Sequence, residues 1–302
     1  MVRRDQGPHR VRPQCVRRRA RRRLLVLGAA VALASACASA PRPIISPVTD
    51  APTQVVRPGK FVWVDLVTHD VAGAKAFYGA LFGWTFDGEE DGYVTVLLDG
   101  SAIAGIVDVE RPEGWARESG WLGNLSVADV DRAAAAAAEA GGVVERGPVD
   151  APERGRMALV RDPAGAHVLL LRSASGDPPD ELPPRRRFLW RELWTQDVGA
   201  AIDFYAAIAG YDAESVEFRD QIYRVLTVDG VPRAGVVEAP TEVDPQWLPY
   251  VRVENPAFIA ERAKALGARV VLRDDDAVIL VDPTGAPIGV QAWGEKPPEV
   301  AP

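Results

Sequence analysis

The stretch that decides the fold runs from residue 61 to residue 84 and reads FVWVDLVTHDVAGAKAFYGALFGW. A second copy starts 127 positions later, at residue 188, and reads FLWRELWTQDVGAAIDFYAAIAGY. Phe61, Trp63, Asp70 and Tyr78 are among the residues that recur without a gap, and the carboxylate of Asp65 meets that of Glu192. So many matches in one register indicate an internal repeat.

Each copy is typical of a strand followed by a helix. Alternation places positions 61, 63, 65 and 67 on one face of the first strand. Asp70 precedes apolar residues at helical spacing and suits a helix N-cap, and Gly83 suits the helix stop. The second copy repeats this plan, with Asp197 as the cap.

The rest of the chain continues the repeat. In the first half, we expect strands at 93–98, 102–107, 121–127, 143–149, 156–160 and 167–172 and a second helix at 130–140. In the second half, strands are expected at 188–194, 221–228, 232–237, 247–253, 269–273, 277–281 and 287–293, with helices at 198–209 and 256–266. Matching Asp-Gly turns and matching DPxG turns punctuate both halves.

Composition divides the chain into six parts. Residues 1–37 have a basic run followed by a short apolar run, which predicts an export or lipoprotein signal. Residues 38–59 are rich in Pro, Ser and Thr and predict a disordered tether. Two folded domains are expected at 60–172 and 188–293, with a linker at 173–187 and a tail at 294–302.

The charge is distributed unevenly between the leader and the body. The whole chain carries a formal charge of −7, yet its first fifty residues hold eleven Arg against two Asp. The body is therefore strongly acidic, which argues against a nucleic-acid partner.

Cys37 follows the apolar run and stands where a bacterial lipoprotein would be lipidated. We therefore expect an exported protein, anchored through Cys37 to the extracytoplasmic face of the cell membrane. An ordinary secretory peptide cut near Ala40 is the alternative.

Together these motifs resemble the vicinal oxygen chelate superfamily, also called the glyoxalase/bleomycin resistance/dioxygenase fold. The opening strand is similar to that of its glyoxalase-like branch in actinobacteria. The resemblance implies an α+β fold with two tandem glyoxalase-like domains. Each domain would consist of paired βαβββ-type modules whose curved mixed sheet surrounds a cleft.

For many members, the resemblance also implies a divalent metal held by two His and one Glu. The matching positions are Trp63, Leu122 and Leu169 in the first domain and Trp190, Leu248 and Gly289 in the second. None of these residues has an imidazole, thiolate or carboxylate, the groups that bind such metals. We therefore predict no metal and no cofactor.

Period-two alternation predicts the other side chains that line each cleft. The candidates are Trp63, Asp65, Asn124 and His167 in the first domain, and Trp190, Glu192, Trp194, Tyr250, Arg252 and Gln291 in the second. An aromatic wall with a few convergent polar groups is typical of a small-molecule pocket.

Structural roles compete with these ligand contacts. Asp65 and Glu192 would each need a partner, because burying an unpaired carboxylate is costly, and that partner could be an Arg or a backbone group that only positions the fold. His167 is either a general base or a structural residue. Trp63 and Trp190 are either core residues or a ligand platform.

The sequence therefore favours metal-independent binding of a small organic molecule at the cell envelope. Two alternatives stay open. One is a lyase or dioxygenase-type enzyme with atypical metal ligands such as Asp65, His167 or Glu192. The other is a scaffold that only pairs with other proteins.

Overall fold

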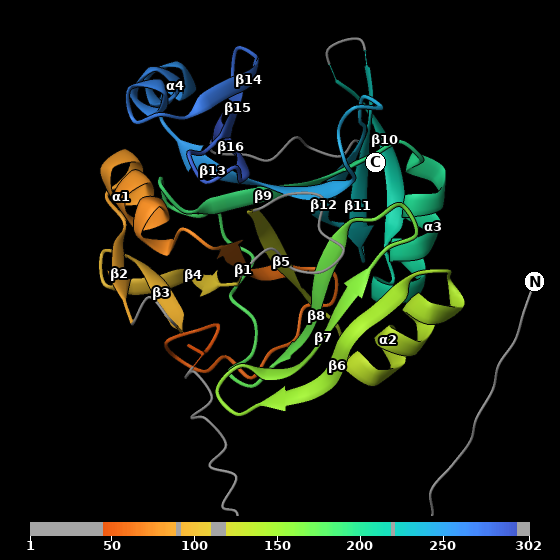
Figure 1. The fold of residues 1–302 in the computed structure, drawn as a ribbon. Coiled ribbons are helices and arrows are strands. Elements are labelled where there is room, and N and C mark those ends of the chain that lie inside the picture. The colour runs from red at the N-terminus through yellow and green to blue at the C-terminus, as the bar shows by residue number, and fades with distance from the viewer. Residues whose placement is uncertain (1–44, 89–91, 110–118, 219–220, 295–302) are drawn as a thin grey trace, which may run out of the picture. The chain divides into compact units, whose positions relative to one another are not determined.

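The computed structural model describes residues 45–88, 92–109, 119–218 and 221–294 (Figure 1). The fold described below belongs to one compact unit, residues 43–302. The predicted signal, Cys37 and nearly all of the predicted tail lie outside the described residues.

Domain 1 is one mixed sheet with two helices. Its elements are β1 (Phe61–Thr68), α1 (Val71–Phe82), β2 (Thr85–Asp87), β3 (Tyr93–Leu98), β4 (Ser101–Asp108), β5 (Gly120–Ser126), α2 (Val130–Glu139), β6 (Val143–Ala151), β7 (Gly155–Arg161) and β8 (His167–Ser173). The strands lie in the order β2-β3-β4-β1-β5-β8-β7-β6.

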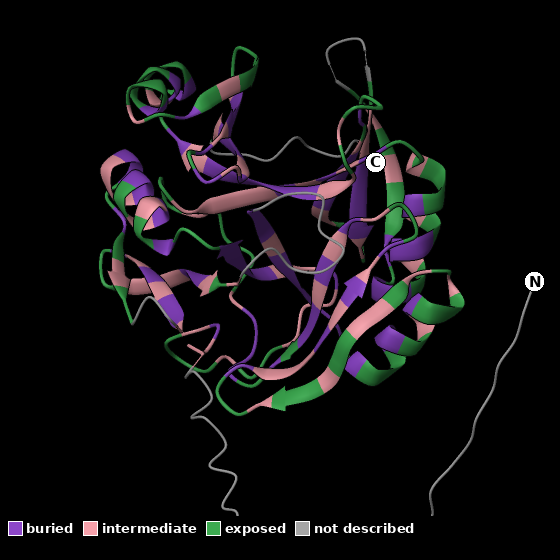
Figure 2. Cartoon of the chain, in the orientation of Figure 1, coloured by how far each residue is buried: buried purple, intermediate pink, exposed green. Residues whose placement is uncertain are grey.

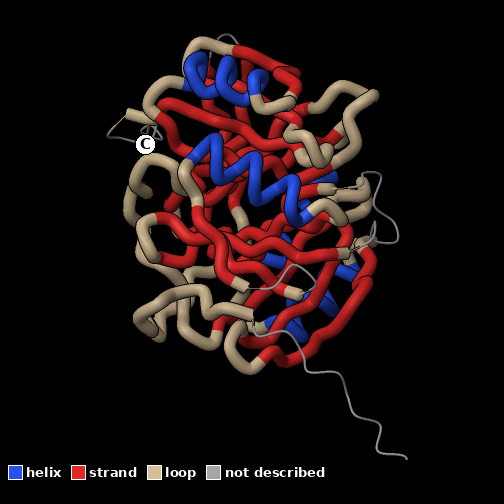
Figure 3. The backbone as a smooth tube through the Cα atoms, turned by 60° about the vertical axis from the view of Figure 1, so that its left-hand side comes forward, coloured by secondary structure: helices blue, strands red, loops and turns tan. Residues whose placement is uncertain are grey.

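Domain 2 repeats this topology. Its elements are β9 (Phe188–Thr195), α3 (Val198–Ala209), β10 (Asp212–Phe218), β11 (Gln221–Val228), β12 (Val231–Glu238), β13 (Gln246–Val253), α4 (Pro256–Ala265), β14 (Arg269–Arg273), β15 (Ala277–Val281) and β16 (Pro287–Ala292). The order β10-β11-β12-β9-β13-β16-β15-β14 matches that of domain 1. The predicted fold class of paired βαβββ modules is confirmed (Figure 3).

The helix boundaries follow the predicted signals. The Asp70 carboxylate accepts a hydrogen bond from the Gly73 amide at 2.8 Å, and Asp197 accepts one from the Ala200 amide at 2.9 Å. Gly83 adopts a left-handed conformation with φ of 71°, which ends α1 with little strain because glycine has no Cβ.

One strand in each domain, β2 or β10, was not predicted from the sequence. The three residues of β2 are half-buried or exposed, and β10 carries charged residues along much of its length. Both are edge strands, which need only one neighbour and bury little apolar surface. The alternating hydrophobic signal is therefore weak in both.

The helix-bearing faces of the two sheets form cores that both domains share. In the first core, α1 and β4 of domain 1 pack with α4, β15 and β16 of domain 2. In the second core, α2 and β7 of domain 1 pack with α3 and β12 of domain 2. Figure 2 shows the buried sides of these helices in purple. The first module of each domain thus shares its core with the second module of the other.

The two DPxG turns receive hydrogen bonds from the opposite domain. The Tyr78 hydroxyl of α1 donates to Asp282 Oδ2 at 2.6 Å, and the Tyr205 hydroxyl of α3 donates to Asp162 Oδ2 at 3.2 Å. The Phe-Tyr pairs and the DPxG turns of the repeat therefore connect the two domains.

Residues 45–59, here called the strap, follow a defined path along domain 1. Strap amides donate to the Ser175 carbonyl and to the Asp177 carboxylate, both in the linker. Val48 is only 7% exposed and packs with Trp63 and Leu171. The prediction of a disordered tether is wrong for this part, because contacts with the domain and the linker offset the entropy of ordering it.

Candidate functional site

The inner face of each sheet, opposite the helices, holds most of the predicted site residues. In β1, Val64 and Leu66 point into the first core, whereas Trp63 belongs to a separate apolar cluster with Val48. A register shift between Phe61 and Trp63 changes the alternation. Phe61 therefore packs against Trp247 on the helix-bearing side, with ring centroids 4.6 Å apart, so its predicted place beside Trp63 was wrong.

Asp65 is the centre of a buried network on the inner face of domain 1. Its Oδ1 accepts hydrogen bonds from Trp63 Nε1 at 3.0 Å and from the Tyr93 hydroxyl at 2.7 Å. Its Oδ2 accepts one from Asn124 Nδ2 at 2.9 Å. Trp63, Asp65 and Asn124 therefore lie in contact on one face. The hydrogen bonds donated to Asp65 offset the free-energy cost of burying its carboxylate.

Arg154 joins this network from the turn between β6 and β7. Its Nη2 donates to the Tyr93 hydroxyl at 2.7 Å, and its guanidinium carbon lies 4.2 Å from the centroid of the Trp63 ring. Burial raises the pKa of Tyr93 well above its usual value, and the Asp65 charge adds to that shift. Tyr93 therefore stays protonated and links the arginine to the carboxylate.

Glu192 occupies the matching position in domain 2. Its Oε1 accepts a hydrogen bond from the Tyr223 hydroxyl at 2.9 Å. Its Oε2 accepts from the Tyr250 hydroxyl at 2.6 Å and from Trp194 Nε1 at 3.3 Å. Trp190 Nε1 donates to the Tyr223 hydroxyl at 2.8 Å, so four of the predicted residues and Tyr223 form one network.

The two inner faces differ in exposure. Trp63, Asp65, Tyr93 and Asn124 are buried, whereas Trp190, Glu192, Trp194 and Tyr223 keep partial exposure. Burial among aromatic rings still raises the pKa of Glu192, although its three hydrogen bonds counteract that shift. The same burial raises the pKa of Tyr223 and Tyr250 well above the usual value, and the Glu192 charge raises it further.

Tyr93, Tyr223 and Arg154 were not among the site residues predicted from the sequence. The tyrosines match at a spacing of 130 positions, the spacing that also relates Gly105 to Gly235 and the two Asp-Gly turns. A Cβ on Gly105 would lie 2.1 Å from the Tyr93 hydroxyl, and one on Gly235 would lie 1.7 Å from that of Tyr223. Each glycine therefore leaves room for its tyrosine, and aligning the Asp-Gly turns would have found the pair.

Comparison with known proteins places these features in a family. A model described as Glyoxalase/Bleomycin resistance protein/Dioxygenase superfamily matches residues 60–170, and one described as Glyoxalase-like domain matches residues 192–290. The chain belongs to this glyoxalase superfamily.

Two curated relatives of this superfamily member align over most of its length. It is 32% identical over 245 residues to a putative glyoxylase, CFP32, of Mycobacterium bovis, covering 76% of this chain and 93% of the relative. It is 30% identical over 266 residues to the anthracycline biosynthesis protein DnrV of Streptomyces peucetius, covering 81% of this chain and 97% of the relative.

Solved structures share the glyoxalase fold at low sequence identity. A Mn(II)-bound glyoxalase from Novosphingobium aromaticivorans gives a TM-score of 0.55 at 14% identity, covering 79% of this chain and 83% of that one. An extradiol ring-cleaving dioxygenase from B. fuscum gives a TM-score of 0.56 at 16% identity, and the alignment covers 85% of this chain and 77% of the dioxygenase chain. At these identities the likeness supports the fold alone.

The residues present do not fit the metal that the superfamily implies. Trp63, Leu122 and Leu169 occupy the implied ligand positions of domain 1, on the neighbouring strands β1, β5 and β8. Within the described residues, no three His, Cys, Asp or Glu side chains are grouped so that they could hold an ion. The side chains at these positions are therefore aromatic or aliphatic and offer no donor atom, whereas the metal would need imidazole and carboxylate ligands.

Three predicted residues lie outside the two networks. His167 Nε2 is 3.2 Å from a Glu145 oxygen, and burial lowers the pKa of this histidine. Arg252 donates to the carbonyls of Pro183 and Trp293 at 2.9 and 3.3 Å and so holds the linker. Gln291 is half-buried on β16, beside Arg252 in the strand pairing.

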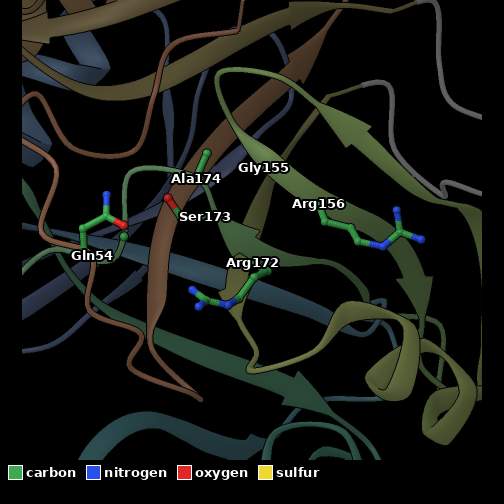
Figure 4. A pocket seen from close by; sticks show the side chains of 7 residues that line it. Gln54, Gly155, Arg156, Arg172, Ser173 and Ala174 are labelled. Carbon is green, nitrogen blue, oxygen red and sulfur yellow. The ribbon is translucent and has the colours of Figure 1, made fainter.

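A cavity of about 380 Å³ opens elsewhere, between the strap and the β7–β8 pair. Its lining consists of Gln54, Gly155, Arg156, Arg172, Ser173, Ala174 and Gly176. Figure 4 shows the Arg156 side chain extending away from Gln54. Arg156 is already paired with Asp131 and Asp150. None of the predicted site residues lines this cavity.

Proposed function

We propose that this superfamily member binds a small organic molecule, without a metal, on the inner face of domain 2. The observation that carries the proposal is the carboxylate of the half-buried Glu192, which is surrounded by Trp190, Trp194, Tyr223 and Tyr250. Aromatic side chains around one oriented polar group are typical of ligand pockets. The equivalent residues of domain 1, Trp63, Asp65 and Asn124, are buried.

The hydrogen bonds indicate which ligand groups would fit. A carboxylate has about four acceptor positions, and Glu192 uses one on Oε1 and two on Oε2. The remaining position on Oε1 suits an N–H or O–H donor. The tryptophan and tyrosine rings suit a planar apolar body. We therefore favour a planar aromatic molecule with an amino or hydroxyl group.

The name of one relative supports this class of ligand. The name of the Streptomyces relative connects it with anthracycline biosynthesis, and anthracyclines are planar fused-ring compounds that carry hydroxyl and amino groups. By analogy, we propose such a compound as the probe with which to begin.

The test measures doxorubicin binding to the full chain by quenching of the drug's fluorescence. We expect saturable binding that weakens at least about tenfold in Glu192→Gln, the cost of a well-placed charged hydrogen bond. Asp65→Asn changes the equivalent carboxylate of domain 1 and should bind like the wild type. Equal loss in both variants, or no binding by the folded wild type, would overturn the proposal.

An enzymatic role is the second candidate, and the raised pKa of Glu192 favours it. A carboxyl whose pKa lies nearer neutrality can donate or accept a proton on a bound substrate, with Tyr223 and Tyr250 orienting it. Turnover of a bound compound, lost in Glu192→Gln while binding persists, would support catalysis over simple binding.

We further propose that the protein acts at the cell envelope, anchored through Cys37. Cys37 lies outside the described residues, and no helix among the residues that the structure describes is long and apolar enough to cross a bilayer. Cell fractionation tests the anchor: the wild type should pellet with membranes and Cys37→Ala should not. Recovery of the whole wild-type chain in the cytosol would contradict both anchoring and export.

A further inference from the structure

The guanidinium of Arg154 has more donors than partners. This side chain is 1% exposed, and it makes one hydrogen bond, from Nη2 to the Tyr93 hydroxyl. Nε and Nη1 are buried and have no hydrogen-bond partner among the described residues. No carboxylate of the described residues lies within ion-pair distance of it.

Burying such a group is costly, because each unmade hydrogen bond and the unpaired charge count against the folded state. The stacking of Arg154 on Trp63 compensates only in part, because it contacts the face of the guanidinium and leaves the N–H groups at its rim unused. The geometry therefore calls for an acceptor that the described residues do not supply.

Asn124 adds a second unused group to the same network. Its Oδ1 is buried and has no partner among the described residues. The amide orientation is well determined, because Nδ2 faces two acceptors, Asp65 Oδ2 at 2.9 Å and the Leu122 carbonyl at 3.3 Å. Unused donors and an unused acceptor thus border one inner face, as expected where a polar ligand binds.

The position of Arg154 also bears on the missing metal site. Trp63, at the first implied ligand position, is the residue on which the guanidinium stacks. Side chains without metal-binding groups therefore stand at the implied ligand positions on this face, and a fixed organic cation lies beside one of them. A guanidinium cannot be lost to chelators, and it prefers oxygen anions.

We propose that Arg154 takes over the role of the metal as the cation of domain 1, and that it binds the carboxylate of a small organic acid beneath the strap. Tyr93 and Asp65 hold the guanidinium in place, and Asn124 Oδ1 accepts from any hydroxyl that the acid carries. The strap residue Val48, packed against Trp63, closes the site. This site is separate from Glu192, so either proposal can fail without the other.

The indole N–H of Trp63 gives a direct readout, because it donates to both Asp65 and Tyr93. The experiment titrates the ¹⁵N-labelled full chain with sodium acetate, with sodium chloride at equal ionic strength as the salt control. The Trp63 signal is assigned by its loss in Trp63→Phe. We expect a saturable shift with acetate that chloride does not reproduce.

Variants separate the site from a general salt effect. Arg154→Lys keeps the charge but loses the planar donor set, and the half-saturating acetate concentration should rise at least about tenfold. Glu192→Gln should respond like the wild type. A Trp63 signal that acetate does not move, or that moves equally in Arg154→Lys, would overturn the proposal. If Arg154→Lys does not fold, a wild-type signal indifferent to acetate still decides against it.

Discussion

The Tyr78 hydroxyl donates a hydrogen bond to Asp282 Oδ2 across the two domains, at a distance of 2.6 Å. Trp121 Nε1 donates to the same hydroxyl at 3.2 Å, and Asp282 Oδ1 organises its own turn by accepting from the Thr284 and Ala286 amides. One buried carboxylate therefore shapes a turn of domain 2 and fixes a helix of domain 1.

We predict that Tyr78→Phe destabilises the protein by about 1–3 kcal/mol, because it leaves a buried carboxylate oxygen without its donor. Urea unfolding measures the loss. Asp282→Asn keeps an oxygen for the turn amides, so a double-mutant cycle isolates the contact, and its coupling energy should be at least about 0.5 kcal/mol. Additive effects of the two changes would show that the hydrogen bond contributes nothing.

The equivalent contact between Tyr205 and Asp162 is longer, at 3.2 Å. Tyr205 also accepts a hydrogen bond from Trp247 Nε1, at 2.7 Å. We therefore predict that losing the hydrogen bond to Asp162 in Tyr205→Phe lowers the free energy of unfolding by less than losing the bond to Asp282 in Tyr78→Phe. The coupling energy between Tyr205→Phe and Asp162→Asn, measured by the same urea assay, should be correspondingly smaller. A larger coupling there would contradict the ranking of the two contacts by distance.

A substitution at Gly105 tests whether the hydrogen bonds between Tyr93 and Asp65 require a residue without a Cβ at this position. A Cβ there would meet the Tyr93 hydroxyl at 2.1 Å and Asp65 Oδ1 at 2.3 Å. Gly105→Ala should destabilise the fold by about 1–3 kcal/mol through overpacking, as measured by thermal unfolding. Gly199→Ala is the control, since its Cβ would lie 3.6 Å from the nearest atom, in the first turn of α3. Equal effects would indicate that helix and strand propensities, not the network, decide the outcome.

Glu192 should make stability depend on pH in a defined direction. Burial raises the pKa of Glu192, so the folded chain holds this proton more tightly than the unfolded chain does. The stabilisation from this group is complete below the unfolded pKa of about 4.3 and is lost as pH rises through the raised folded pKa. The stability of the wild type relative to Glu192→Gln should therefore fall over this window, in urea unfolding series at successive pH values.

The control for this pH series is Glu254→Gln, because Glu254 is exposed and forms an ion pair with Arg185 at the surface. Its difference from the wild type should show no comparable decline. A constant difference between wild type and Glu192→Gln across the window would mean that the glutamate is equally easy to ionise in both states.

The sequence predicts this fold well wherever local chemistry repeats. Asp70, Gly83 and the alternating residues of β1 carry local signals that appear twice, so the repeat reinforced each one. The face of Phe61 was predicted wrongly because a single register shift reverses alternation, and nothing local marks that shift.

The candidate site was predicted only where it lies on regular strands. Asp65 and Glu192 occupy central strands, and alternation alone places them on the inner face. Arg154 reaches the same face from a turn, so its position depends on how the β6–β7 hairpin curves over the sheet. The order of the strap likewise depends on contacts with residues more than one hundred positions away, such as Ser175.

The strap supplies the last prediction, through the contrast between two of its valines. Val48 is 7% exposed within the cluster of Trp63 and Leu171, whereas Val55 is 43% exposed. A positive charge at Val48 would be buried beside the Arg154 guanidinium that stacks on Trp63, so Val48→Lys should release the strap locally while the shared cores stay folded. Hydrogen exchange across residues 45–59 should then become at least about tenfold faster, and acrylamide should quench Trp63 more readily. Val55→Lys should leave both measurements unchanged. Identical behaviour of the two variants would mean that Val48 does not hold the strap, and that the backbone hydrogen bonds to Ser175 and Asp177 suffice.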